Sequence, residues 1–197
     1  MKLIVASNNA GKIREIRSLL KQIDVYSPDD LNVQIEVEET GSSFFENAQL
    51  KAEAFALETG MTALADDSGL RVDALNGQPG IHSARFGSPE LDDIGRCKLL
   101  LRHLQNFPSQ HERKARFCCS MVAFSPNGKR CESMGYCEGH ITSKITGNGG
   151  FGYDPVFFVT SHGCTMAQLS KTAKNSISHR GNALQTIRPK LLRLLHE

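Results

Sequence analysis

Short runs of consecutive apolar residues alternate along this chain with longer stretches in which apolar residues recur every three or four positions. The first run, 3–6, predicts a buried strand, and the stretch after it predicts a helix that begins near Lys12. A second helix is predicted over 43–58, where apolar side chains share one face. Strands that alternate with helices in this way are typical of an α/β protein.

The remainder of the chain continues the pattern. The run 62–65 predicts a buried strand that ends at Asp66 and Asp67. We further expect a helix over 91–105, a hairpin of strands 115–124 and 130–138, an apolar strand over 156–159 and a last helix over 178–196. Pro189 removes a backbone hydrogen bond from that last helix, so we expect a kink there. The elements together predict a mixed, twisted sheet flanked by helices.

Composition narrows the class of protein. The chain has 197 residues, 40% of them hydrophobic and 22% charged, which suits one domain, 1–197, or two lobes that share a sheet. Its net charge of +2 includes no long run of one sign, so neither a nucleic-acid polymer nor a membrane is expected as partner. The first apolar run is too short for a signal peptide, and none approaches the roughly 18 residues of a membrane helix. We therefore expect a cytoplasmic protein.

The six cysteines carry little information about function. They contain no C-x-x-C pair, and a chain of this size needs no disulfide framework. Cys118 and Cys119 are neighbours in a predicted strand, where successive side chains point to opposite faces and do not easily share a metal. We expect most of these cysteines to be buried thiols and disfavour a zinc site.

The turn between the first strand and the first helix is a candidate phosphate site. Its sequence is Ser7-Asn8-Asn9-Ala10-Gly11-Lys12, and the N–H groups at a helix start carry partial positive charge. A lysine there opposes the helix dipole at a cost of about 0.3–1 kcal/mol, which favours an anion beside Lys12. The alternative is a solvated surface lysine after a capping asparagine. The segment lacks the glycine spacing of a P-loop, so a Walker-type ATPase is disfavoured.

Two acidic segments are candidates for metal binding and catalysis. Asp66 and Asp67 would repel each other if both were buried and ionised, and the end of a strand is where α/β proteins commonly bind ligands. Mg²⁺ would relieve that repulsion, since it takes one or two carboxylates together with phosphate oxygens. In the second segment, Glu36 and Glu38 fit a solvated edge strand, whereas Glu39 beside a glycine turn is the stronger candidate.

The glycine-rich loop 149–155 places two aromatic rings and a carboxylate just before an apolar strand. The rings are Phe151 and Tyr153, and the carboxylate is Asp154. Glycine allows backbone angles that other residues resist, and the apolar strand would hold the loop still. A planar ligand could stack on such a loop, although a tight structural turn is the alternative.

Basic residues gather around Ser178, which can cap the last helix. They are Lys171, Lys174, His179 and Arg180. Cations at a helix start oppose the dipole, as Lys12 does at the first helix. Both anomalies disappear if phosphate or a purine carbonyl lies between the two helix starts.

Six of these motifs occur in the order and spacing of the inosine triphosphate pyrophosphatase family, which hydrolyses non-standard purine nucleoside triphosphates. They are 7–12, Glu39-Thr40-Gly41 with Phe45-Glu46-Asn47-Ala48 and Lys51, 65–70, 79–85, 150–155 and 178–181. The resemblance covers nearly the whole chain. It departs at His82, where bacterial relatives often carry tyrosine, and at Asn8, where some carry glycine. Neither is a catalytic position of the family.

The resemblance implies a homodimer, an active-site cleft between two lobes, Mg²⁺ dependence, and conversion of ITP, dITP or XTP to the monophosphate and pyrophosphate. It also implies roles for matching residues. The triphosphate would be held by Ser7, Asn8, Asn9, Ala10, Gly11, Lys12 and Lys51. Asp67 would bind the metal and act as general base, with Glu39 as second metal ligand and Asp66 or Ser68 in support. The base would contact Phe151, Gly152, Tyr153, Asp154, Lys174, His179 and Arg180, with Phe151 stacked on the purine.

Two other classes of function remain open from the sequence. A nucleotide-binding regulator could sense a purine nucleotide without hydrolysing it, but a pure binder has no need of paired carboxylates at Asp66 and Asp67. A nucleic-acid-binding protein could use the basic helix starts, but the charge is balanced and no stripe of interleaved basic and aromatic residues is present.

Overall fold

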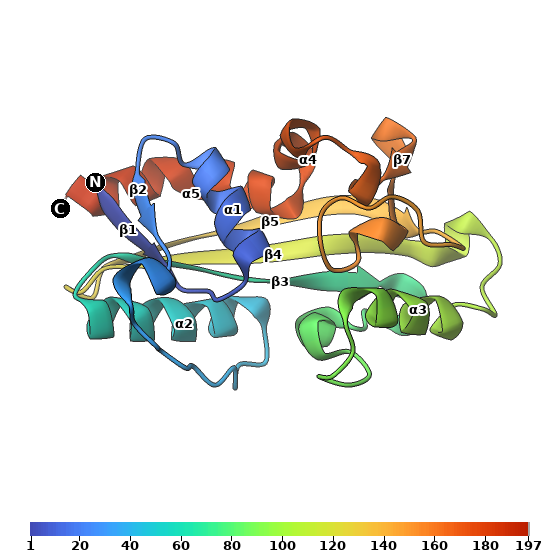
Figure 1. The fold of residues 1–197 in the computed structure, drawn as a ribbon, viewed down its shortest axis with the longest axis horizontal. Helices are drawn as coiled ribbons and strands as arrows, with labels where there is room; N and C mark the ends of the chain where they lie inside the picture. Colours follow the sequence, from blue (N-terminus) through green and yellow to red (C-terminus); the bar gives the residue numbers. More distant parts are fainter. Residues whose placement is uncertain (197) are drawn as a thin grey trace. The chain divides into compact units, whose positions relative to one another are not determined.

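The structure, a computed structural model, describes residues 1–196, so Glu197 at the end of the predicted domain lies outside the described residues. Within that range the strands form a seven-stranded sheet in the order β2-β1-β3-β4-β5-β6-β7 (Figure 1). The strands are β1 (Lys2–Val5), β2 (Asp24–Tyr26), β3 (Ala63–Val72), β4 (Lys114–Phe124), β5 (Arg130–Ile141), β6 (Phe157–Val159) and β7 (Cys164–Thr165). β1 pairs in parallel with β2 and β3, whereas β6 pairs antiparallel with β5 and β7, so the sheet is mixed as predicted.

The helices are α1 (Ala10–Leu19), α2 (Phe44–Thr59), α3 (Asp93–His103), α4 (Lys171–Ile177) and α5 (His179–His196). Short 3-10 turns connect them at Asp29–Leu31, Asp73–Leu75, Gly80–Arg85, Gln110–Arg113, Asp154–Val156, Thr160–His162 and Met166–Gln168. None of the helices within residues 1–196 is long and apolar enough to cross a membrane.

The chain divides into two compact units. Unit 1 comprises Met1–Asp67, Cys119–Gly135 and the chain from His179 onward, and unit 2 comprises Ser68–Cys118 and Tyr136–Ser178. The strands β3, β4 and β5 contribute residues to both units.

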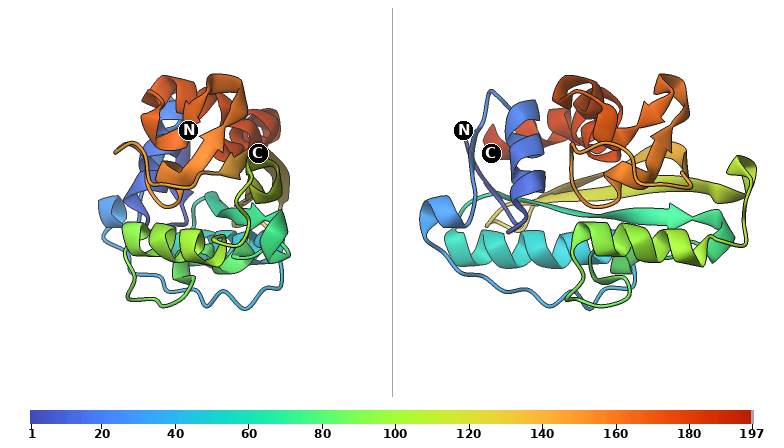
Figure 2. Two further views of the ribbon diagram at one scale, coloured as in Figure 1. Left: turned by 90° about the vertical axis from the view of Figure 1, so that its right-hand side faces the viewer. Right: turned by 45° about the vertical axis from the view of Figure 1, so that its right-hand side comes forward.

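Unit 1 has a core on each face of its strands. In β1, Leu3 and Val5 join the cluster with α1 and α5, whereas Ile4, together with Ala6 just after the strand, joins the cluster with α2. Figure 1 shows α2 below the strands of this unit and α1 and α5 above them, and Figure 2 shows α2 on the same face from other directions. Side chains on successive residues of a strand point to opposite faces, and a parallel strand covered on both faces is therefore apolar throughout.

Unit 2 has a single apolar cluster of buried residues, among those that the structure describes. Helix α3 contributes Cys97 and Leu100, and its C-cap residue Leu104 continues the same face at a spacing of three and four residues. They pack with strand residues that include Phe117 and Phe157, whose ring centroids lie 4.5 Å apart. This cluster holds the strand that follows the glycine-rich loop, as the apolar run predicted.

Arg113 joins the C-terminal end of α3 to other segments of unit 2. Its Nη2 donates to the carbonyl of Leu104 at 2.9 Å, its Nε to that of Phe107 at 2.6 Å and its Nη1 to that of Thr142 at 2.7 Å. The last carbonyls of a helix lack partners within the helix, so a guanidinium there satisfies one of them and favours the negative end of the dipole.

Most predicted elements are confirmed with shifts of a few residues, and α5 contains Pro189. The kink expected at that proline stays a prediction. Two predictions are wrong. β3 does not end at Asp66 and Asp67 but continues to Val72, so the two carboxylates lie in mid-strand. The segment with Glu36 and Glu38 is exposed at these two residues, as expected, but is not a strand. Helix α4 was not predicted, because its seven residues are too few for a periodic pattern.

The cysteines of the described chain are all free thiols. Cys97, Cys118, Cys119 and Cys137 are buried, and two others are partly exposed. Burial raises the pKa of the Cys137 thiol to about 11, which keeps it protonated and unreactive near neutral pH.

Candidate active site

The start of α1 forms a capped turn. Asn9 is the N-cap, and its Oδ1 accepts from the N–H groups of Gly11 at 2.9 Å and Lys12 at 3.1 Å. Ser7 in turn accepts from the N–H of Asn9 at 3.2 Å. Asn8, Asn9 and Ala10 are exposed, so the outer side of this turn faces solvent. The capping asparagine of the alternative interpretation is therefore present.

Lys12 is not the solvated surface lysine of that alternative. Its side chain is 15% exposed, and its Nζ lies 3.2 Å from Oδ1 of Asp66. The side chain of Lys12 thus points toward a buried carboxylate, which compensates for the unfavourable position of its charge at the positive end of the helix dipole. Its placement at the helix start is explained by charge pairing with β3 as well as by any anion at the turn.

Asp66 lies at the centre of a buried ion-pair network in unit 1. The Nε and Nη2 of Arg180 donate to its Oδ2 at 3.1 and 2.8 Å, and the Nη1 of Arg180 donates to Glu15 at 2.5 Å. Asp66 and Arg180 are almost fully buried. Burial acts to raise the pKa of Asp66, but the charges of Arg180, Lys12 and Lys51 outweigh it and hold the pKa well below its usual range. Asp66 is therefore a permanent anion at neutral pH.

Asp67, the next residue of β3, has a different environment. Its Oδ1 lies 3.3 Å from Nζ of Lys51, and its Oδ2 accepts from Nδ2 of Asn47 at 3.3 Å. Burial raises the pKa of Asp67, because the cost of desolvating its carboxylate exceeds the stabilisation by Lys51 and Lys12. The negative charges of Glu39 and Asp66 raise this pKa further. The repulsion expected between adjacent carboxylates is reduced because the two side chains contact different helices, Asp66 contacting α1 and α5 and Asp67 contacting α2.

Glu39 joins the network through Lys51. The Nζ of Lys51 lies 2.7 Å from Oε1 of Glu39 and also donates to the carbonyl of Asp66 at 3.1 Å. Burial acts to lower the pKa of Lys51, but Asp67 and Glu39 outweigh it and the pKa is raised. Lys51 is therefore a cation that holds two carboxylates near one point.

The oxygen donors fit a hard divalent cation in part. Within residues 1–196 no group of three or more His, Cys, Asp and Glu side chains is placed to hold a metal ion. Glu39 and Asp67, however, converge on a single cationic nitrogen, and Mg²⁺ is commonly bound by one or two carboxylates with phosphate oxygens and water for the rest. The pair therefore fits Mg²⁺ that arrives with a phosphate-bearing ligand.

The glycine-rich loop of unit 2 is organised around Asp154. Its Oδ2 accepts from the N–H of Phe151 at 2.9 Å and pairs with Nζ of Lys174 at 2.5 Å. The same Nζ lies 4.6 Å from the centroid of the Phe151 ring, a cation–π geometry. Gly150 has φ +74°, and a Cβ there would lie 1.9 Å from Oδ2 of Asp154, so another residue would displace this carboxylate.

The two aromatic rings of the loop differ in exposure. Phe151 is partly exposed, so part of this residue is accessible to a ligand. Tyr153 is 5% exposed, and its hydroxyl donates to the carbonyl of Ser83 at 2.8 Å. Of the pair, Phe151 is the ring that can stack, and Tyr153 anchors the loop to the turn Gly80–Arg85.

The predicted site residues fall into two groups. Unit 1 contains the 7–12 turn, Glu39, Lys51, Asp67, His179 and Arg180, and its ion pairs connect Lys12, Asp66 and Arg180 as well as Glu39, Lys51 and Asp67. Unit 2 contains Ser68, the loop residues 151–154 and Lys174, with Asp154 as the centre of that group. Ser178, expected to cap the last helix, is the C-cap of α4.

Two further residues of the unit 1 group were given no role from the sequence, although Asn47 stands in one of the motifs that carry the family resemblance. Asn47 is fully buried on α2, accepts from the N–H of Gly41 at 2.8 Å and donates to Asp67. A signal existed, because Asn47 is a polar residue on the apolar face that contains Phe44 and Ala48. Glu15 carried no comparable signal, since a glutamate on an amphipathic helix is ordinarily solvated.

Comparison with known proteins gives consistent matches over nearly the full chain. The sequence model of the Ham1 family matches residues 3–190. A protein of Treponema denticola named dITP/XTP pyrophosphatase is 46% identical over 187 residues, covering 95% of this chain and 96% of the relative. A protein of the same name from Desulforamulus reducens is 48% identical over 187 residues, covering 94% and 92%. The solved Ham1 protein of Staphylococcus aureus superposes with a TM-score of 0.86 at 41% identity, covering 98% of this chain and all of that one.

Proposed function

Since the chain belongs to the Ham1 family, we propose that it hydrolyses the non-canonical purine nucleoside triphosphates ITP, dITP and XTP to the monophosphate and pyrophosphate. Relatives about 45% identical carry the name dITP/XTP pyrophosphatase, which supports this substrate class. Removal of such nucleotides would cleanse the nucleotide pool, and we propose a cytoplasmic location because that pool is there.

The observation that carries the proposal is the contrast between Asp66 and Asp67. Asp66 is already neutralised by Arg180 and Lys12, so it has little basicity left. Asp67 keeps a less compensated carboxylate beside Lys51 and Glu39. We assign Asp67 as the general base that takes a proton from the attacking water, with Asp66 as a fixed anion that orients Lys12.

The lysines and the 7–12 turn would bind the triphosphate. Lys12 and Lys51 are partly buried cations, so a phosphate oxygen that approached them would be attracted with little screening by water. The turn has an exposed outer side at a helix start, which suits an anion. Ser68, the next residue after Asp67, is a further proposed substrate contact. Preorganised charges of this kind account for much of the catalysis in phosphate chemistry.

We propose Mg²⁺ as cofactor, held by Glu39 and Asp67 together with phosphate oxygens of the substrate. When bound, it would neutralise phosphate charge and lower the pKa of water. Lys51, which joins both carboxylates, would keep them together before the substrate arrives.

We propose that unit 2 supplies the contacts to the base. Phe151 would stack on the purine, Lys174 would donate to its C6 carbonyl, and Gly152, Tyr153 and Asp154 would shape the loop. His179 and Arg180 stay predicted contacts to the edge of the base. The donor nitrogens of Arg180 contact Asp66 and Glu15, which supports a role in holding the catalytic strand as well. Adenine carries an amino group at C6, so donors aimed there would disfavour ATP.

The test is a panel of ITP, dITP, XTP, GTP and ATP with Mg²⁺, with phosphate measured by malachite green. We expect phosphate from ITP, dITP and XTP only after an inorganic pyrophosphatase is added, since the bond cleaved lies between the α- and β-phosphates. Phosphate without the added pyrophosphatase would contradict this proposal. A chelator should abolish turnover and Mg²⁺ should restore it.

The same panel, with added measurements of ITP binding and of DNA binding, separates the other classes of function. A non-hydrolytic regulator would bind ITP without releasing pyrophosphate, and a nucleic-acid-binding protein would retain DNA in moderate salt. The proposed homodimer predicts a mass of twice 21.7 kDa by light scattering. A mass of a single chain at micromolar concentration would contradict it.

A further inference from the structure

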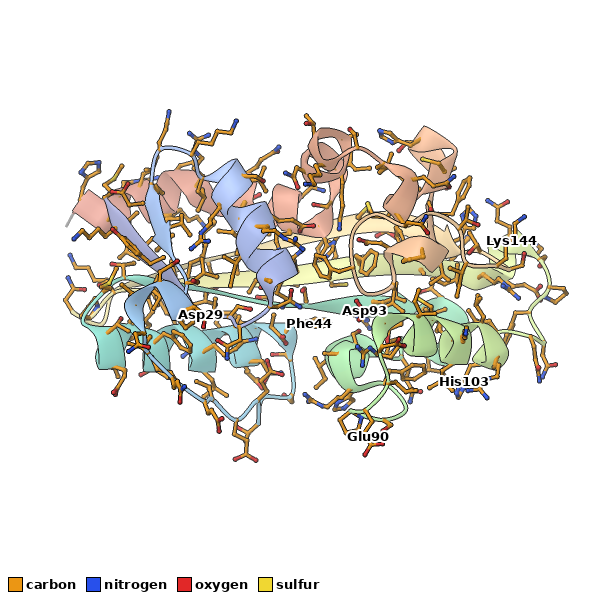
Figure 3. All side chains as sticks on the ribbon, viewed as in Figure 1. Asp29, Phe44, Glu90, Asp93, His103 and Lys144 are labelled. Carbon is orange, nitrogen blue, oxygen red and sulfur yellow. The ribbon has the colours of Figure 1, made fainter. Side chains whose placement is uncertain are left out.

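We propose that Asp93 and Cys97 on α3 are positioning residues that hold the glycine-rich loop and thereby set the selectivity for the purine base. The inference rests on the proposed function, because it concerns the loop assigned to base recognition. Neither residue belongs to the loop or to the basic cluster around Lys174. Figure 3 labels Asp93 at the start of α3 and His103 at its other end.

The two side chains contact both sides of one residue, Gly152. Oδ2 of Asp93 accepts from the N–H of Gly152 at 2.7 Å, and Sγ of Cys97 donates to the carbonyl of Gly152 at 3.4 Å. Residues four apart on a helix share a face, so one turn of α3 presents both groups to the loop. Gly152 has φ +61°, a left-handed conformation that other residues rarely adopt, and these contacts hold it there.

Asp93 is itself held in place. Its Oδ1 pairs with Nη2 of Arg96 at 2.9 Å, which leaves Oδ2 for Gly152. Arg96 also donates to the carbonyl of Leu91, just before the helix. The side chain of Asp93 is 46% exposed, so its hydrogen bond with Gly152 is of moderate strength. The ion pair with Arg96 keeps the carboxylate in the orientation that the loop requires.

Cys97 serves as a donor and not as a nucleophile. It is fully buried, and burial raises the pKa of its thiol to about 12, so the proton that it donates stays on the sulfur at neutral pH. The thiol is a weak donor, and its contribution is therefore smaller than that of Asp93.

The residues on either side of Gly152 are connected to the groups that would contact the base. Phe151 precedes it and gives its N–H to Asp154, which pairs with Lys174. Tyr153 follows it and is anchored at Ser83. If Gly152 shifted, the Phe151 ring and the carboxylate of Asp154 would move relative to Lys174. The orientation of these groups, more than their presence, decides which purine edge fits.

Helix stability is the competing explanation, because an aspartate in the first turn favours the helix dipole. The chain offers a matched control. Asp92 is the N-cap of α3, with Oδ1 accepting from the N–H of Gly95 at 2.6 Å, and among the described residues it makes no hydrogen bond or ion pair with the loop. Asp92→Ala would weaken the same end of the same helix without touching Gly152.

The experiment measures binding of IMP and AMP by titration calorimetry, with tripolyphosphate as a ligand that lacks a base. Asp93→Ala should weaken IMP binding about fivefold, a typical effect of one hydrogen bond, with binding of AMP and tripolyphosphate within about twofold of wild type. Asp93→Asn keeps an acceptor oxygen and should recover most of the loss. Cys97→Ala should give a smaller loss in the same direction. Equal loss of IMP binding in Asp92→Ala and Asp93→Ala, or no loss in Asp93→Ala, would overturn the inference.

Amide hydrogen exchange distinguishes a failure of the inference about Asp93 and Cys97 from a failure of the proposed function. Asp93→Ala should accelerate exchange of the Gly152 amide by about tenfold, in a protein otherwise folded. If wild type binds no IMP, the proposed function fails whatever the exchange shows. If wild type binds IMP and exchange accelerates without a change in the IMP to AMP preference, Asp93 holds Gly152 but does not set selectivity, and the inference is wrong.

Discussion

The two units organise their candidate functional residues in different ways. In unit 1, charged side chains from β3, α1, α2 and α5 pair with one another in the buried interior, as Asp66 does with Arg180 and Lys12. In unit 2, the buried ion pair of Asp154 with Lys174 is combined with side chains that hold the backbone of the loop at Phe151 and Gly152. Unit 1 should therefore be sensitive to changes of charge, and unit 2 to changes of shape as well.

The strongest test of this contrast is Asp67→Asn. The change keeps shape and volume but removes the proposed base, so we expect kcat for ITP to fall by about 10²–10⁴-fold with an unchanged circular dichroism spectrum. Glu38→Gln removes a nearby exposed carboxylate and should leave kcat unchanged. A folded Asp67→Asn protein that keeps more than about a tenth of the rate would show that Asp67 is not the base.

The buried network of unit 1 should also determine stability. Arg180→Leu leaves Asp66 and Glu15 without their guanidinium, so we expect the free energy of unfolding to fall by about 3–5 kcal/mol in urea. Arg188→Leu, on the same helix but exposed, should change it by less than about 0.5 kcal/mol. Similar losses in the two variants would mean that the network contributes no more than a surface arginine.

The lowered pKa of Asp66 sets the pH dependence of that difference. A carboxyl group with a lower pKa in the folded than in the unfolded state contributes stability that is fully present above the unfolded value of about 3.9, and the contribution decreases as the pH falls below it. Removing Arg180 raises the pKa of Asp66 in the folded variant, so the stability gap between wild type and Arg180→Leu should be widest near neutral pH and narrow as the pH falls through that raised pKa. A gap that widened in acid would reverse the sign assigned to Asp66.

In unit 2, Lys174→Ala tests base recognition. Loss of the proposed donor to the C6 carbonyl should lower kcat/KM for ITP about tenfold more than for ATP. Lys171→Ala, exposed on the same helix, is the control and should leave the ratio unchanged. An equal loss with both substrates would assign Lys174 to phosphate and not to the base.

The smallest expected effect is that of the α1 cap. Asn9→Ala removes the acceptor for two N–H groups and should lower the free energy of unfolding by about 1 kcal/mol, measured by urea denaturation. Asn8→Ala, at an exposed neighbouring position, should be nearly neutral. Equal losses of unfolding free energy in Asn9→Ala and Asn8→Ala would contradict the assignment of Asn9 as the stabilising cap.

The sequence predicted elements whose apolar patterns are long, such as α2 and the strands β4 and β5. It placed the end of β3 wrongly, because two aspartates usually terminate a strand and here they are neutralised by partners from distant segments. The pairing of Arg180 with Glu15 spans 165 residues, and no local pattern encodes such a contact.

The candidate site could be predicted from the sequence where a residue is of a type that its local structure disfavours. Lys12 at a helix start and the glycines of 149–152 break local preferences, and both are explained by tertiary contacts. Asp93 gave no such signal, because an aspartate in a first helical turn satisfies every local rule. Its contact with Gly152 emerges from the three-dimensional fold alone.

The alternation of β3 has a consequence for how this chain can change over evolutionary time. Asp66 and Asp67 owe their different partners to pointing in opposite directions from one strand. A single-residue insertion or deletion between Ala63 and Asp66 would exchange the two orientations and also turn the apolar side chains of the strand around. The number of residues in this segment is therefore constrained independently of their identity, because it decides which helices each carboxylate can reach.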